Sequence, residues 1–116
     1  MIGGHRSERV AEEISHEVSL MLAGDLRDPR IAAAITVSEV RMTPDMRTVR
    51  VYVLLVGDEA ERDQAMVGLK AAAGYVRHEL TERLHLRRSP EVLFIPDTSE
   101  EYGGRIESLL KKIKEP

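Results

Sequence analysis

Arginine is the residue type whose number and spacing could do chemistry in this 116-residue sequence, since it occurs 13 times against four lysines. A guanidinium can bind a phosphate through two parallel hydrogen bonds, so clustered arginines are candidate contacts to a nucleic-acid backbone. The main predicted RNA-binding set lies in the second half of the chain and comprises Ala72, Ala73, Gly74, Arg77, Arg83, Arg87 and Arg88. A secondary set near the N-terminus comprises Arg6, Arg9, Arg27 and Arg30.

The net charge of −3 does not by itself favour a nucleic-acid partner, but the acidic residues are unevenly distributed. Residues 58–63 hold four of them, and outside that stretch bases and acids are equal at 16 each. An arginine excess can also follow from the base composition of a genome. Composition therefore permits an RNA-binding face, and a protein-interaction module without RNA affinity is the alternative. Salt dependence separates the two, because phosphate binding weakens steeply as salt rises.

Catalytic and metal chemistry find little support in the sequence. His78, Glu82 and His85 are spaced so that one helical face could present all three to a metal. Histidine and glutamate are ordinary on an exposed helix, however, and no fourth ligand is evident. The sequence has no P-loop, zinc-protease, dinucleotide-binding or nucleophile-elbow motif, and no cysteine. We predict no catalytic residue, no metal, no cofactor and no small-molecule substrate.

Length and composition favour one domain with its own hydrophobic core, since 42% of the residues are hydrophobic. Aromatic residues make up only 3%, which argues against a single-strand binder built on aromatic stacking. No apolar run approaches the roughly 18–20 residues of a membrane span. No apolar segment follows the N-terminus as in a signal peptide. We therefore expect a cytoplasmic protein with no membrane partner.

A first helix must position Arg6 and Arg9. Ser7 is a predicted N-cap, Gly24 is a predicted stop, and Pro29 interrupts the charged connector that follows. The apolar residues that recur at helical spacing between these signals are Val10, Ile14, Val18, Met21 and Leu22.

A β-hairpin is predicted next. Alternating apolar residues indicate strands over 31–42 and 47–56, joined by a turn at 43–46. In the first strand the alternation shifts by one residue, which predicts a bulge near Ser38 and Glu39. In the second strand, the residues predicted to face the helices are Val49, Val51, Val53 and Leu55.

A long helical run follows, and it must position the main arginine set. Asp58 and Glu61 have the spacing of a capping box. Gly74 interrupts the run and predicts a kink or a break between two helices. A break there would free backbone amides to bind a phosphate, with Arg77 in the first turn beyond it. The alternative is that the small residues beside Gly74 only allow close helix packing.

The remaining elements complete an α+β fold. A third strand is predicted over 91–95 and an amphipathic helix within 98–116. The order α-β-β-α-(kink)-α-β matches the type II K-homology arrangement, with a three-stranded sheet covered on one face by helices. We predict one K-homology-like domain over 1–116, with 98–116 as a C-terminal helical extension.

Several short motifs, taken in order, resemble the ribosome-binding factor A family over nearly the whole chain. They are Arg6-x-x-Arg9-Val10, Asp28-Pro29-Arg30, Thr36-Val37-Ser38, Val51-Tyr52-Val53, Ala72-x-Gly74-Tyr75-Val76-Arg77 and the run from Leu86 to Phe94. Each motif is weak alone, and the ordered set is specific. K-homology domains clamp nucleic-acid backbone with a Gly-x-x-Gly loop. This sequence has Ala72-Ala73-Gly74 there instead, a departure that points to this family.

The resemblance implies a function that no single residue reveals. It implies a non-catalytic bacterial assembly factor that binds the immature 30S subunit through 16S rRNA. It further implies support for subunit maturation, including 5′-end processing, and for growth in the cold. A monomer is also implied.

Overall fold

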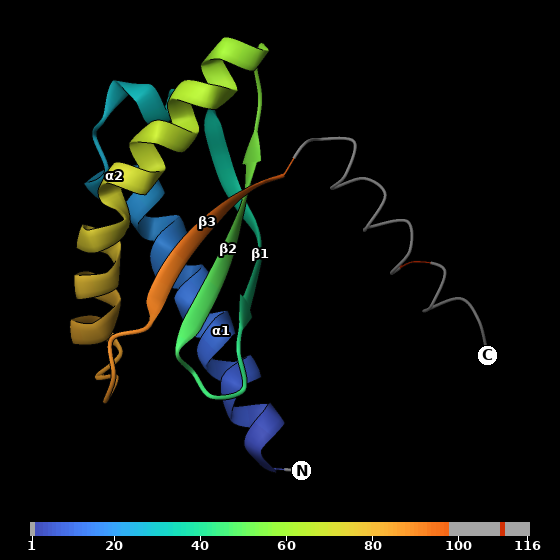
Figure 1. The fold of residues 1–116 in the computed structure, drawn as a ribbon, viewed down its shortest axis with the longest axis vertical. Helices are drawn as coiled ribbons and strands as arrows, with labels where there is room; N and C mark the ends of the chain where they lie inside the picture. The colour runs from blue at the N-terminus through green and yellow to red at the C-terminus, as the bar shows by residue number, and fades with distance from the viewer. Residues whose placement is uncertain (1, 98–109, 111–116) are drawn as a thin grey trace.

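The computed structural model describes residues 2–97 and residue 110. Two helices and three strands make up most of the described chain (Figure 1). In chain order the elements are α1 (Ile2–Leu20), a π-helical turn η1 (Met21–Asp25), a 3₁₀ helix η2 (Pro29–Ala33), β1 (Ala34–Met42), β2 (Thr48–Leu55), α2 (Glu59–Arg83) and β3 (Glu91–Asp97). This is an α+β fold, as predicted.

The sheet has the strand order β1-β2-β3. β1 pairs antiparallel with β2, which confirms the hairpin, and β2 pairs parallel with β3. A parallel pair needs a crossover connection, and α2 supplies it. The predicted bulge is confirmed by a register shift between Val37 and Glu39, and a second shift lies between Ala34 and Thr36.

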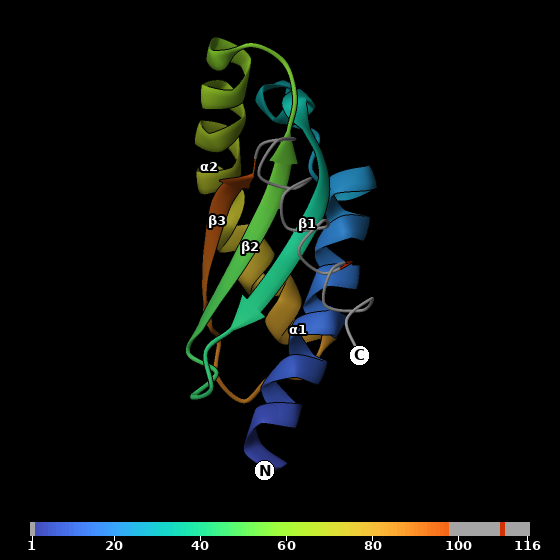
Figure 2. The same cartoon turned by 90° about the vertical axis from the view of Figure 1, so that its right-hand side faces the viewer.

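Both helices lie on the same face of the sheet (Figure 2). The four β2 residues predicted to face the helices are all buried, with at most 3% exposed surface at Leu55. They pack with Ile14 and Val18 of α1 and with Leu69, Val76 and Leu80 of α2. The one-sided layer is therefore confirmed, because strict alternation fixes which face of a strand meets the core.

The start of the first strand was predicted wrongly. Residues 31–33 belong to the 3₁₀ helix, not to β1. The Asp28 side chain accepts a hydrogen bond from Arg30 N–H (2.9 Å), and Pro29 occupies the first turn. A cap followed by proline starts a helical turn, which overrides the apolar alternation that continues into the strand.

The ends of the first helix also differ from prediction. α1 begins at Ile2, so Ser7 lies inside the helix and is not its N-cap. At the other end, the Leu26 N–H donates to Met21 O (2.9 Å), which closes a π-helical turn. Gly24 lies within this wider turn, so it does not end the helix as a left-handed stop.

Of the two structures predicted at Gly74, a kink or a break between two helices, the break is wrong. α2 is a single α-helix from Glu59 to Arg83, although its direction changes about midway along its length (Figure 1). The capping box of Asp58 and Glu61 is confirmed by reciprocal hydrogen bonds of 2.8 and 3.0 Å. In a continuous helix the amides after Gly74 are occupied by intrahelical hydrogen bonds. They therefore form no phosphate-binding helix N-terminus.

The glycine that allows close packing is Gly68, not Gly74. A Cβ at Gly68 would lie 2.8 Å from Cγ1 of Ile31 and 3.2 Å from Cβ of Arg30. Among residues 2–97, a Cβ at Gly74 would have no neighbour within 4 Å. The close approach of α2 to the 3₁₀ helix thus depends on Gly68. In the Ala71–Gly74 run, Ala73 packs against the core, whereas Gly74 itself makes no close contact with the described residues.

The predicted C-terminal helix within 98–116 lies outside the described residues, apart from residue 110. Within the part of the chain that the structure describes, no helix is both long and apolar enough to cross a membrane.

Candidate nucleic-acid interface

The predicted RNA-binding arginines separate into those held by other parts of the chain and those that are not. Arg83 belongs to the first group. Its guanidinium contacts Asp25 (2.7 Å), Glu17 (3.2 Å) and Glu79 (3.0 Å). Hydrogen bonds to Asp25 and then Glu17 raise the pKa of this guanidinium. Arg83 therefore ties the end of α2 to α1 and to the turn after it.

Arg77 is also held within the fold. Its Nε donates to Ser89 Oγ (2.9 Å) and its Nη2 donates to Ser89 O (2.8 Å). The Thr81 hydroxyl lies 3.0 Å from the same Ser89 Oγ. Arg77 thus fixes the connector between α2 and β3 and is oriented toward that connector. The prediction that Arg77 stands at the start of a new helix is therefore wrong.

Arg30 is paired with a neighbour in sequence. Its Nη2 lies 2.6 Å from Asp28 Oδ2, and its backbone N–H is capped by the same carboxylate. The hydrogen bonds from Arg30 lower the pKa of the Asp28 carboxyl, and they raise the pKa of the Arg30 guanidinium. This pair braces the connector between η1 and the 3₁₀ helix from within.

Three other predicted arginines converge. Arg6 of α1 and Arg87 and Arg88 of the connector after α2 line one cavity of about 360 Å³, which we call the basic groove. Within the described residues, none of the three has an ion pair or a hydrogen bond, and all are exposed. Their guanidinium donors are therefore available to a ligand.

The floor and rim of the basic groove come from three separate parts of the chain. Apolar side chains from each part share it, namely Val10 of α1, Met42 and Met46 at the β1–β2 turn, and Leu84 and Leu86 after α2. Two acidic residues, Glu13 and Asp45, also line it. The lining thus combines three guanidinium groups and two carboxylates with apolar side chains, which suits a ligand that carries both a base and a phosphate.

The backbone at this groove takes an uncommon conformation twice. Met46 (φ 61°) and His85 (φ 51°) are the two non-glycine residues with positive φ in the described chain, and both line the groove. Such a conformation costs roughly 1–2 kcal/mol per residue. His85 directs the chain away from α2 just before Arg87 and Arg88. The turn at Met46 is closed by its N–H donating to Thr43 O (2.8 Å).

The positive φ at His85 also removes the proposed metal face. The helix ends at Arg83, so His85 does not continue the helical spacing of His78 and Glu82. Within residues 2–97, no group of three or more histidine, cysteine, aspartate or glutamate residues is arranged to hold a metal ion.

The remaining predicted positions do not join the basic groove. Arg9 and Arg27 are exposed elsewhere, and Ala73 packs against the core. Ala72 and Gly74 lie along α2 and do not line the cavity. Of the eleven predicted positions, three meet in one place. Met46 and His85 were not predicted as part of the site, although the turn that contains Met46 was recognised.

Comparison with known proteins identifies the family of the chain. The sequence profile of the family described as ribosome-binding factor A matches residues 6–110. The chain is 41% identical over 109 residues to ribosome-binding factor A of Caldanaerobacter subterraneus subsp. tengcongensis, covering 94% of this chain and 89% of the relative.

Solved structures give the same result. The crystal structure of ribosome-binding factor A from Thermus thermophilus is 27% identical with a TM-score of 0.59, and the match covers 80% of this chain and 93% of that one. A homology model of the Thermus thermophilus factor, fitted into a cryo-EM map of its complex with the 30S subunit, is 26% identical with a TM-score of 0.63. That match covers 75% of this chain and 90% of the other.

Proposed function

Because the chain belongs to the ribosome-binding factor A family, we propose that it binds the small ribosomal subunit through 16S rRNA. It acts as a non-catalytic, monomeric assembly factor in the bacterial cytoplasm. It binds the immature 30S subunit and supports its maturation, including 5′-end processing of the rRNA, and growth in the cold. The fitted complex of the Thermus thermophilus factor with the 30S subunit supports this choice of partner.

The observation that carries the proposal is the convergence of Arg6, Arg87 and Arg88 at the basic groove. Three guanidinium groups around one cavity, each without a partner in the described part of the chain, suit the phosphates of a folded or single-stranded RNA segment. Each phosphate contact releases counterions, so binding through three arginines makes affinity fall steeply with salt. Arg77 and Arg83, which other parts of the chain hold, contribute indirectly because they fix the end of α2 and the connector that carries Arg87 and Arg88.

We also propose that the fold is a variant of the type II K-homology arrangement. The parallel pairing of β2 with β3 through a helical crossover supports this description. In the variant, the paired helices are fused into the single bent α2, and no Gly-x-x-Gly loop separates them. The nucleic-acid surface then moves from that loop to the far end of α2.

Binding to purified 30S subunits at several salt concentrations tests the function. The test variant carries Arg6→Gln, Arg87→Gln and Arg88→Gln. The matched control carries Arg41→Gln, Arg50→Gln and Lys70→Gln, which removes the same charge from exposed positions elsewhere. We expect the test variant to bind about 100-fold more weakly at low salt and to lose about 2 from the log–log salt slope.

Two outcomes would contradict the proposal. Equal weakening by the test and control variants would show that only total charge matters and that the basic groove is not the interface. Binding that is insensitive to salt and to both variants would favour a protein-interaction module without RNA affinity. Melting curves for all variants establish that each is folded.

A further inference from the structure

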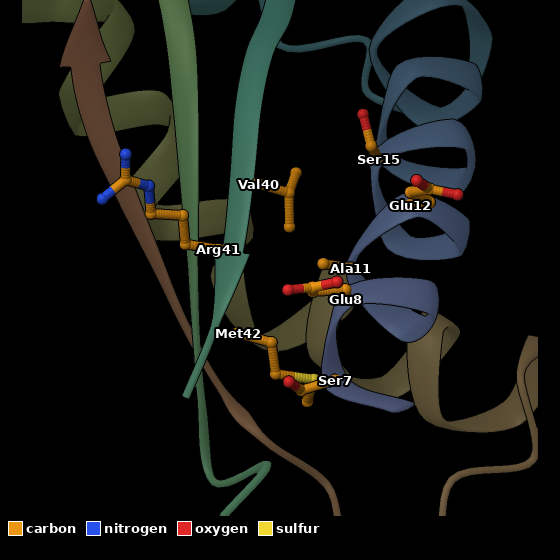
Figure 3. Close-up of a pocket in the computed structure, with 8 residues that line it drawn as sticks. All are labelled: Ser7, Glu8, Ala11, Glu12, Ser15, Val40, Arg41 and Met42. Atoms are coloured by element: carbon orange, nitrogen blue, oxygen red, sulfur yellow. The ribbon is translucent and has the colours of Figure 1, made fainter. Parts of the chain in front are cut away.

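A second groove lies on the other side of α1, between this helix and the edge strand β1 (Figure 3). Its volume is about 510 Å³. Figure 3 shows Val40 and Met42 of β1 pointing toward α1, whereas Arg41 points away from the groove. Glu8 and Glu12 of α1 line the opposite wall. We call this cavity the acidic groove.

Among the described residues, no strand pairs with the outer edge of the strand that borders the acidic groove. β1 is an outer strand of the described sheet. Thr43 N–H donates to Thr48 O (3.0 Å), so the backbone groups of Thr43 face β2. In an antiparallel pair this orientation alternates along the strand. The backbone N–H and C=O groups of Val40 and Met42 therefore point away from β2, beside the groove, where they can pair with a further strand.

The two glutamates give this edge a charge preference. Glu8 and Glu12 are one helical turn apart, and like charges at this spacing destabilise a helix. Both are exposed, and in the described part of the chain neither has an ion pair or a hydrogen bond. A cation from a partner would relieve this repulsion.

We propose that the acidic groove docks an extended, arginine- or lysine-rich protein segment as a fourth strand alongside β1. The segment pairs its backbone with the open groups of Val40 and Met42. Its basic side chains on the helix-facing side reach Glu8 and Glu12, and their aliphatic stems cover the apolar floor. This surface goes beyond the proposed rRNA contact, because negative groups repel a phosphate backbone.

The charge of the groove decides between occupants. A second copy of this chain pairing edge to edge would bring the glutamates of both copies together, which disfavours that occupant. The other basic candidate within the sequence is the cluster Lys111, Lys112 and Lys114. The experiment below distinguishes each of these two occupants from a basic segment of a partner protein.

The test measures binding of a fluorescent ten-residue peptide that alternates arginine and valine to the full chain at low salt. We expect Glu8→Gln with Glu12→Gln to weaken binding by about tenfold. The matched control, Glu82→Gln with Glu91→Gln, removes two exposed carboxylates elsewhere and leaves binding unchanged. A peptide of the same sequence with N-methylated backbone amides on its pairing edge binds as weakly as the double glutamate variant, because it cannot extend the sheet.

Four results would overturn the proposal. Equal binding of the methylated peptide would show a purely electrostatic contact without strand pairing. Equal loss with the control variant would show that the acidic groove is not the site. A dimer in sedimentation that disappears with the Glu8 and Glu12 substitutions would assign the groove to a second copy. Peptide binding that appears only after Lys111, Lys112 and Lys114 are changed to glutamine would assign it to the chain's own C-terminal segment.

Discussion

The two faces of the N-terminal half of α1 differ in charge although they share one helix. One face carries Arg6, Val10 and Glu13 into the basic groove, and the other carries Glu8 and Glu12 into the acidic groove. Met42 of β1 lines both cavities. A few residues of one helix thus separate a surface suited to phosphate from one suited to a basic protein segment. The net charge of −3 conceals this division, because opposite charges cancel in the sum and not on the surface.

The strongest test of this comparison removes the support that both grooves share. Ile14 is fully buried between α1 and the sheet. We expect Ile14→Ala to lower the free energy of unfolding by about 2–5 kcal/mol, because it leaves a cavity in the core. Denaturant unfolding measures the loss. Binding of 30S subunits and of the basic peptide should then fall together near the unfolding midpoint. Loss of one activity alone would mean that the grooves do not depend on a common helix.

Charge reversal in each groove should affect the binding of one ligand and leave the binding of the other intact. We expect Arg87→Glu with Arg88→Glu to weaken 30S binding by about 100-fold at low salt and to leave binding of the basic peptide intact. Glu8→Lys with Glu12→Lys should abolish peptide binding and leave 30S binding within about threefold of wild type. Equilibrium binding of each variant to both ligands checks the pair. If both variants weakened 30S binding equally, the division between the grooves would be wrong.

Substitutions at the two glycines of α2 test whether 30S binding at the basic groove depends on Gly74 itself or only on an intact α2. Gly74→Ala should raise the free energy of unfolding by about 1 kcal/mol, because the position is exposed and helical and a methyl group meets no neighbour. 30S binding should be unchanged. Gly68→Ala should instead lower stability, because its Cβ would lie 2.8 Å from Cγ1 of Ile31. Thermal melts compare the stability of the two variants. If Gly74→Ala lowered the melting temperature, the absence of a side chain at Gly74 would be needed for the fold after all.

The smallest effect is expected from the acidic residue within the basic groove. A hydrogen bond from the Thr43 hydroxyl (2.7 Å) lowers the pKa of Asp45 below its ordinary value of 3.8. Asp45 is therefore ionised at neutral pH. Removing this charge by Asp45→Asn should raise 30S affinity by about two- to threefold at low salt. Unchanged or weaker binding would show that phosphate does not approach this side of the groove.

The same carboxylate gives a pH dependence with a defined sign. Because the pKa of Asp45 is lower in the folded state, its stabilisation is present above pH 3.8 and is lost as pH falls through the folded value. At neutral pH the melting temperature of the wild type should exceed that of Asp45→Asn, and this difference should disappear as the pH is lowered into the acid range. A gap that widened as pH fell would contradict the assigned direction.

Much of the architecture could be predicted because its signals are local. The alternation of Val49, Val51 and Val53 fixed the buried face of β2, and the Asp58 capping box marked the start of α2. Predictions failed where two local signals competed. At residues 31–33 the cap and proline outweighed the strand pattern, and at Gly74 the cost of one glycine was too small to break a long helix.

The sequence by itself determined the identity of the elements, the face that each buries and the abundance of arginine. Only the tertiary structure decided which arginines are available to a ligand. Arg77 and Arg83 are held by Ser89 and by three carboxylates, whereas Arg6 meets Arg87 and Arg88 from the opposite end of the described chain. The physical reason is that helix and strand formation depend on residues a few positions apart. Convergence of charged side chains depends on how α1, the β1–β2 turn and the end of α2 pack around one core.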